Sequence, residues 1–226
     1  MKKNYWLIAF LADSVLELAT NLFPLPILHW FTKPLLMILL LGYFITWTSE
    51  NKGKLRNMII IALIMSWFGD WLLIFQEYNP IFFILGLVAF LMAHIAYIIG
   101  FLRIENNMPV VNKILIITVF IIYSTGLVYM LWPGLGDMML PVIVYAMVLT
   151  TMGIIGIIKN NNQNILVSLG VLLFVASDSL LALNKFLNQF AYSGLFIMIT
   201  YIAAQYLIIE GIGRSLTSKK PGTATA

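Results

Sequence analysis

The chain has 226 residues, of which 62% are hydrophobic and only 10% charged, and its mean hydropathy is +0.97. Soluble domains carry about 25% charged residues, and here the apolar content continues along the whole chain, so we predict a polytopic membrane protein without a separate soluble domain. The net charge of +4 is explained by basic residues beside membrane spans and does not indicate a nucleic-acid partner. The absence of cysteine excludes a disulfide framework, a thiolate nucleophile and a cysteine-ligated metal.

Apolar runs long enough to cross a membrane predict an all-α fold of eight transmembrane helices, the second of them short. In chain order they cover residues 5–23, 34–48, 57–75, 81–102, 113–132, 137–158, 165–183 and 190–211. Between them lie the breaks Pro24 and Pro26, Lys52-Gly53-Lys54, Asn79-Pro80, Asn106-Asn107, Pro133-Gly134 and residues 160–164. We therefore expect a transmembrane domain over residues 1–214 and a short, polar, disordered tail over 215–226.

Basic residues predict the orientation. If eight helices cross the membrane in alternating directions, all thirteen Lys and Arg residues except Lys33 and Lys185 fall on the same side of the membrane. The cytoplasmic side of a membrane protein is enriched in Lys and Arg, so both termini are expected in the cytoplasm. We expect the chain to lie in a cell membrane, the inner membrane of a bacterium.

Two aspartates stand inside apolar runs. Asp70 lies in Met65-Ser66-Trp67-Phe68-Gly69-Asp70-Trp71-Leu72-Leu73, and Asp178 lies in Leu173-Phe174-Val175-Ala176-Ser177-Asp178-Ser179-Leu180-Leu181. A gapless alignment of Asp70 on Asp178 also pairs Gly86 with Gly194, which indicates a weak four-plus-four internal repeat. A carboxylate at the centre of a membrane helix costs about 2.5–3.5 kcal/mol, so these residues are candidates for function.

Other polar side chains fall at a similar depth. Glu17 lies at nearly the level of the two aspartates, and Ser66 precedes Asp70 by one turn. His94 and Tyr97 share a face of the fourth helix, as Tyr201 and Gln205 share one of the eighth. Lipid cannot satisfy such groups, so they are expected to face inward and to line a polar intramembrane cavity.

Structural interpretations remain open for several of these residues. Asp70 and Asp178 could form ion pairs with Lys33 or Lys185, and a buried His94 could simply be part of the core. Two histidines and no cysteine are too few for the usual catalytic zinc site, and we expect neither a metal nor a cofactor. No nucleophile-elbow or Walker-type sequence is present. Carboxylates with a lysine, a histidine and a tyrosine suit general acid–base catalysis.

Five motifs in order resemble those of the YhhN-type lysoplasmalogenases. They are Thr32-Lys33-Pro34-Leu35 opening the second helix, Ser66-x-x-Gly69-Asp70-x-x-Leu73, Gly86-x-x-x-Phe90-x-x-x-His94-x-x-Tyr97, Phe174-x-x-Ser177-Asp178-x-x-Leu181-Ala182-x-x-Lys185-Phe186 and Tyr201-x-x-x-Gln205. The resemblance spans roughly residues 33–210, and the first helix carries no such motif.

The resemblance implies a hydrolase that cleaves the vinyl ether of a lysoplasmalogen into a fatty aldehyde and glycerophosphoethanolamine or glycerophosphocholine. A neutral carboxylic acid would protonate the vinyl carbon, and a carboxylate would stabilise the resulting cation and activate water, much as in glycosidases. Asp70 and Asp178 are assigned to these roles, without deciding which residue takes which. Lys33 or Lys185 would contact the lipid phosphate.

The remaining candidate residues are expected to bind the substrate or water: His94, Tyr97, Gln205, Glu17 and Ser66. The partners implied are the lysophospholipid and the surrounding membrane lipid, and the sequence does not predict an oligomeric state. The alternative function is a small-molecule or lipid transporter with an acidic site at the membrane midplane, because parallel repeats with buried acids also build transporters.

Overall fold

The fold is an eight-helix bundle. In the computed structural model, which describes residues 2–23, 25–105, 108–160 and 165–218, eight helices are long and apolar enough to cross a membrane. They are α1 (Lys2–Leu22), α2 (Pro26–Trp47), α3 (Lys54–Ile74), α4 (Ile81–Phe101), α5 (Val110–Leu131), α6 (Met139–Asn160), α7 (Ile165–Phe186) and α8 (Ser193–Ser218). Three short 3-10 helices, η1 (Phe75–Glu77), η2 (Trp132–Gly134) and η3 (Gly136–Met138), lie in the connections. The predicted all-α membrane fold is confirmed.

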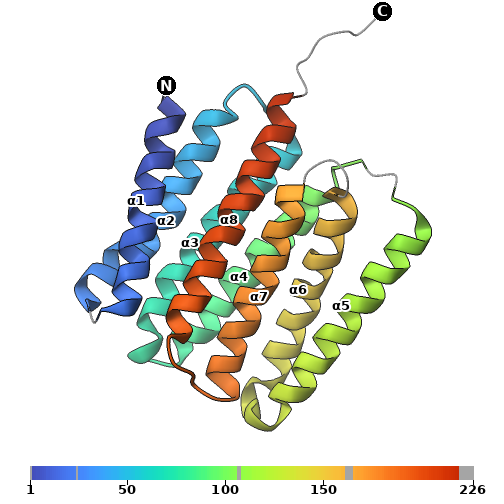
Figure 1. The fold of residues 1–226 in the computed structure, drawn as a ribbon. Helices are drawn as coiled ribbons and strands as arrows, with labels where there is room; N and C mark the ends of the chain where they lie inside the picture. Colours follow the sequence, from blue (N-terminus) through green and yellow to red (C-terminus); the bar gives the residue numbers. More distant parts are fainter. Residues whose placement is uncertain (1, 24, 106–107, 161–164, 219–226) are drawn as a thin grey trace, which may run out of the picture.

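Successive helices run antiparallel, so α1 begins and α8 ends on the same side of the bundle (Figure 1). We call this side the terminal end and the opposite side the far end. The closest packing is between α3 and α4, between α7 and α8 and between α1 and α2. Contacts of α4 with α6, and of α8 with α1 and α2, join the two halves of the chain. Helix α5 lies at the periphery and buries only Phe120 and Leu131.

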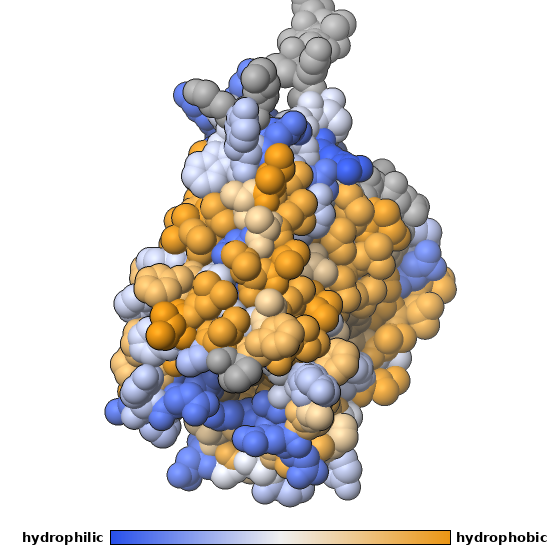
Figure 2. Space-filling model, turned by 60° about the vertical axis from the view of Figure 1, so that its left-hand side comes forward, coloured by the Kyte–Doolittle hydropathy of each residue, from blue (hydrophilic) through white to orange (hydrophobic). Residues whose placement is uncertain are grey.

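The surface has the distribution expected of a protein in lipid. On the face shown in Figure 2, hydrophobic side chains cover a broad middle region, and hydrophilic residues gather toward the two ends. A surface that is apolar over the height of its helices can be covered only by hydrocarbon, because water would penalise so large an apolar area. The polar residues between the two ends are therefore drawn into the interior.

Small residues let the helices approach closely. A methyl group built on Gly170 of α7 would lie 2.8 Å from the carbonyl oxygen of Ala204 and 2.8 Å from the backbone nitrogen of Ile208. Backbone atoms cannot move aside as a flexible side chain can, so glycine at this position sets the distance between α7 and α8. This kind of close packing is characteristic of helices in membranes.

The second helix differs from its prediction. It begins at Pro26 rather than at residue 34, because Pro26 occupies the first turn, where a missing N–H costs nothing. Pro34 stands inside the helix, so the prediction that Thr32, Lys33 and Pro34 open it, and that it is short, was wrong. An interior proline is tolerated in membrane helices because neighbouring groups can satisfy the freed carbonyl.

Other elements also begin or end at residues that differ from the prediction. Helix α8 starts at Ser193, after the predicted start at residue 190, and continues to Ser218, beyond the predicted end at residue 211. The predicted breaks at Pro24 and at Asn106-Asn107, part of the break at 160–164 and residues 219–226 of the predicted tail lie outside the described residues.

Candidate active site

The first of two polar networks surrounds Asp70. The Tyr201 hydroxyl donates a 2.8 Å hydrogen bond to Asp70 Oδ2, and the Gln205 amide lies one turn further along α8. Gln205 Nε2 donates to Ser66 Oγ at 3.0 Å and to Tyr201 Oη at 3.4 Å, and Gln205 Oε1 accepts a 2.5 Å hydrogen bond from Tyr97. Residues four positions apart lie on one face of a helix, so the pair on α3 meets the pair on α8 directly.

This network is closed to solvent and includes four of the predicted site residues. Asp70 is 2% exposed, and Ser66, Tyr97 and Gln205 are also buried. Lys33, half-buried on α2, is the positive charge that acts most strongly on Asp70. A buried carboxylate with a hydroxyl donor and a nearby cation has the partners that such a group requires.

The second network surrounds Asp178. The Tyr145 hydroxyl of α6 donates a 2.6 Å hydrogen bond to Asp178 Oδ2, and His94 Nε2 of α4 lies 3.5 Å from the same oxygen. His94 is fully buried, and neither of its ring nitrogens has a hydrogen-bond partner among the residues that the structure describes. Its ring packs edge-on against Tyr145 and Phe174, with centroids 5.3 and 4.9 Å away. Unpartnered buried polar atoms of this kind are rare in proteins and are available to a ligand or a water molecule.

Asp178 faces a narrow pocket between α4, α5, α6 and α7 with a cavity volume of about 50 Å³. Apolar side chains make up most of its wall, and the polar lining residues are Tyr145, Asp178 and Ser179. Asp70 does not line this pocket. The space beside Asp178 is thus mainly apolar, whereas the sequence led us to expect a polar cavity.

Lys185 stands where this pocket approaches the far end. Its Nζ lies 3.4 Å from Gln76 Oε1 and 4.7 Å from the centroid of the Phe83 ring. Phe83 packs edge-on against Phe186, and both rings line the pocket. Lys185 therefore does not form the ion pair with Asp178 that was considered from the sequence, and its exposed ammonium group remains close to the pocket.

The two networks adjoin each other through Phe174. Its ring packs edge-on against His94 on one side, at 4.9 Å, and against Tyr201 on the other, at 5.7 Å. The two aspartates are contacted by opposite halves of the chain, Asp70 of α3 by Tyr201 of α8, and Asp178 of α7 by His94 of α4. A four-plus-four repeat would produce this arrangement, in which each aspartate is contacted by a residue from the other half of the chain. The repeat itself stays a prediction.

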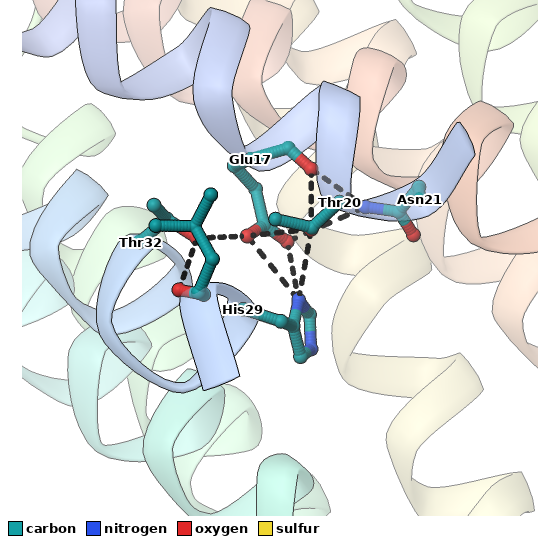
Figure 3. Close-up of polar contacts among 6 residues, drawn as sticks. Glu17, Thr20, Asn21, His29 and Thr32 are labelled. Carbon is teal, nitrogen blue, oxygen red and sulfur yellow. Dashed lines mark hydrogen bonds and ion pairs between the residues drawn. The ribbon is translucent and has the colours of Figure 1, made fainter. Parts of the chain in front are cut away.

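Glu17 belongs to a separate cluster where α1 meets α2 (Figure 3). Its fully buried carboxylate accepts a 2.6 Å hydrogen bond from Thr32 and lies 3.0 Å from His29 Nδ1. Thr20 and Asn21 contact the same group at 3.4 and 3.5 Å. Glu17 acts on Asp70 through its charge, and hydrogen-bond donors of its own cluster already contact both of its carboxylate oxygens. The structure does not bring it into the pocket with Asp178.

Sequence reasoning missed Tyr145. This residue lies within two turns of the start of α6, where a tyrosine is ordinarily an anchor at the membrane interface. The hydrogen bond to Asp178 depends on the packing of α6 against α7, which no local pattern reveals. As for metals, no three His, Asp or Glu side chains within the described residues gather closely enough to hold an ion.

Fold and site together define a polytopic membrane protein with two buried aspartates in adjoining polar networks, one of them at an apolar pocket. The YhhN family model matches residues 28–212, so the chain belongs to the YhhN family, as its motifs suggested. The match leaves out α1 and with it Glu17.

Several relatives are named lysoplasmalogenases. The chain is 30% identical over 162 residues to a lysoplasmalogenase of Mycobacterium bovis, covering 70% of this chain and 61% of that protein. It is 32% identical over 197 residues to the human lysoplasmalogenase TMEM86B, covering 85% of this chain and 80% of the human one. The chain thus spans about three fifths of the length of its mycobacterial relative. No solved structure gives a significant match.

Proposed function

We propose that this protein is a lysoplasmalogenase, which hydrolyses the vinyl ether of a lysoplasmalogen to a fatty aldehyde and a glycerophospholipid headgroup. Family membership supports the reaction class. The observation that carries the proposal is the Asp178 carboxyl group at the wall of a mainly apolar pocket. An acid there can meet a carbon–carbon double bond, which needs a proton donor and no strong nucleophile.

The chemistry uses one proton donor and one water molecule. The acid transfers its proton to the second carbon of the vinyl ether, and the positive charge is shared between the first carbon and the ether oxygen. Water attacks the first carbon and gives up a proton, which leaves a hemiacetal. The hemiacetal then breaks its bond to the glycerol oxygen, which takes the proton, and releases the aldehyde. No oxidant, metal or cofactor is consumed.

We assign the proton-donor role to Asp178, because this residue faces the pocket. Asp70 does not line the pocket and is assigned the role of the carboxylate that stabilises positive charge from the adjoining network, where Tyr201 and Lys33 supply its donor and its counter-charge. His94, with two unpartnered ring nitrogens next to Asp178, would hold the water molecule. Ser66, Tyr97 and Gln205 would fix Asp70 and Tyr201 in place.

Of the two lysines considered for the phosphate, we favour Lys185. It is exposed at the far end beside two rings of the pocket, and it lies two helical turns from Asp178, about 10 Å along α7. This spacing suits a phosphate and a vinyl ether that are separated by a glycerol unit. The charge of Lys33 is instead directed at Asp70. In this proposal Glu17 stabilises the contact between α1 and α2.

The reaction can be tested with the purified protein and two lipids, a lysoplasmalogen and its saturated alkyl-ether analogue. Aldehyde should be released from the vinyl ether alone, because only the vinyl ether can be protonated at carbon. Release from both lipids would contradict the mechanism. Uptake of the vinyl-ether lipid into proteoliposomes without any aldehyde would indicate the transporter instead.

We also propose that the terminal end faces the cytoplasm of a bacterial inner membrane, in line with the distribution of Lys and Arg. The chain lacks cysteine, so single-cysteine variants need no prior substitutions. In intact cells a membrane-impermeant maleimide should label Asn79→Cys and Asp137→Cys, and Lys54→Cys and Arg103→Cys should react only after permeabilisation. The reverse pattern would invert the orientation.

A further inference from the structure

A second hollow lies on the surface between α4 and α6. Its volume is about 270 Å³, and its wall is built from Ile84, Leu87, Val88, Leu91, Leu140, Pro141, Val144 and Tyr145. Val88 and Val144 are 49% and 41% exposed, so the groove opens toward the lipid. The residues come from the beginnings of α4 and α6, which both start at the far end, on the same side as Lys185.

Two residues, Leu87 and Tyr145, line both this groove and the pocket of Asp178. Tyr145 also donates its hydroxyl hydrogen to Asp178. The ring of Tyr145 therefore forms part of the wall between the groove and the acid. A group held in the groove has only this wall between itself and the carboxyl group.

The Asp178 pocket is too small for a hydrocarbon chain. Its volume of about 50 Å³ is well below the ~150 Å³ of an apolar cavity that holds one benzene ring. The chain of a single-chain lipid must therefore leave the pocket once the vinyl ether is beside Asp178. The α4–α6 groove is apolar, larger and adjacent, and its depth matches that of a lipid with its phosphate at Lys185.

We propose that the groove between α4 and α6 binds the hydrocarbon chain of the lipid substrate and admits the lipid sideways from the membrane. This inference rests on the proposed function and extends it to the route of the substrate. Tyr145 is a positioning residue at the junction, because it contacts the chain with its ring and Asp178 with its hydroxyl. Val88 and Val144 face this hydrocarbon chain and then set the selectivity for its length.

Two other lipid-facing hollows serve as comparisons. One lies between α5 and α7 and is lined by Val119, Phe120, Tyr123, Leu172, Val175 and Ala176. The other lies between α2 and α3 and is lined by Met37, Ile38, Leu41, Ile64, Trp67 and Phe68. Neither shares a lining residue with the Asp178 pocket. Ordinary membrane lipid can fill both, but neither leads directly to the acid.

The test fills the groove with tryptophan. Val88→Trp and Val144→Trp place a large ring where the chain would lie, and Leu172→Trp, in the α5–α7 hollow, is the matched control at a similarly exposed position. Displacing even two methylenes of a long chain should raise the KM about tenfold, with kcat little changed. A short-chain lysoplasmalogen, which does not reach the groove, should retain its KM in all variants. A long-chain KM that Val88→Trp and Val144→Trp leave unchanged, or that Leu172→Trp raises equally, would overturn the proposal.

A second measurement separates the groove from the reaction. A saturated alkyl-ether lysophospholipid with a diazirine at the end of its chain cannot be hydrolysed by protonation at carbon, so it reports binding whether or not aldehyde is formed. Photolabelling followed by mass spectrometry should mark α4 and α6, less so in Val88→Trp. Labels on α5 and α7, or on α2 and α3, would refute the groove even if the wild-type protein releases aldehyde. Labels on α4 and α6 without aldehyde release would support the groove and refute the lysoplasmalogenase activity.

Discussion

The hydroxyl of Tyr201 donates a 2.8 Å hydrogen bond to Asp70, a residue 131 positions earlier in the chain. Conversely, Nε2 of His94, in the first half of the chain, lies 3.5 Å from Oδ2 of Asp178 in the second half. Each aspartate is thus held by the last helix of the other half. Because neither half contains a complete set of partners, the site can form only when the two halves pack together.

The first prediction concerns the two acids as a pair. Asp70→Asn and Asp178→Asn should each abolish turnover and leave the thermal unfolding temperature nearly unchanged, since asparagine keeps the shape and can still accept the tyrosine hydrogen bond. Groups that act as a unit are strongly non-additive, so the double variant should be no less active than the worse single variant. If the two activity deficits add instead, the aspartates act independently and the shared mechanism is wrong.

The same pair predicts the dependence on pH. The proposal needs one protonated carboxylic acid and one ionised carboxylate. Activity should therefore fall at low pH, where the carboxylate gains a proton, and at high pH, where the acid loses its own, giving a bell-shaped kcat/KM profile. The acidic limb reports the group that must be ionised, and the alkaline limb reports the group that must be protonated. A profile that is flat between the limits of protein stability would argue against acid–base catalysis here.

The two tyrosines that donate to the aspartates, Tyr145 and Tyr201, allow a matched comparison. Tyr201→Phe removes a hydrogen bond to the Asp70 carboxylate, worth about 1.5–3 kcal/mol, and should lower kcat/KM by about ten- to a hundredfold. Tyr145→Phe removes one to the neutral Asp178, worth about 0.5–1.5 kcal/mol, and should lower kcat/KM by about two- to tenfold. Tyr123→Phe is the control, because the Tyr123 hydroxyl donates at 2.8 Å to Ser179 and not to an acid. We expect near-normal turnover for this variant. Equal activity losses in all three would mean that the effect is structural.

Much of this architecture follows from the sequence because the membrane limits what the chain can do. Spans must be long and apolar, so the eight helices were predictable, and a charge inside a span is costly, so Asp70 and Asp178 stood out. Proline was misleading at Pro34, where its local preference to end a helix was overcome by the packing of α2 in the bundle. The contacts of Asp178 with Tyr145 and of Lys185 with Gln76 join distant segments, and no periodicity in the chain reports them.

A further prediction tests the packing of α7 on α8. Gly170→Val should destabilise the fold by about 1–3 kcal/mol, because the new side chain would meet the backbone of Ala204 and Ile208. Gly126→Val on the peripheral α5 is the control, since nothing lies within 4 Å of a methyl group built there. Thermal unfolding in detergent should separate the two variants clearly. Similar unfolding temperatures for both would show that α7 and α8 can move apart at little cost.

The last prediction concerns His94, whose two ring nitrogens are buried without hydrogen-bond partners in the described part of the chain. Buried polar atoms without partners cost stability, so replacing the ring by an apolar side chain of similar size should leave the unfolding temperature unchanged or raise it. We therefore expect His94→Leu to fold at least as well as the wild-type protein. If the ring holds the water that attacks the cation, the same variant should lose activity by about a hundredfold or more, within the range of general acid–base effects.

His94→Gln provides the companion measurement, because an amide can still bind water in the same place. It should recover part of the lost activity while remaining less stable than His94→Leu, since its polar group is again buried. A histidine that serves only as core packing predicts the contrary result, with normal turnover in both variants. Measuring kcat and unfolding temperature for the wild type and the two variants decides between the two roles.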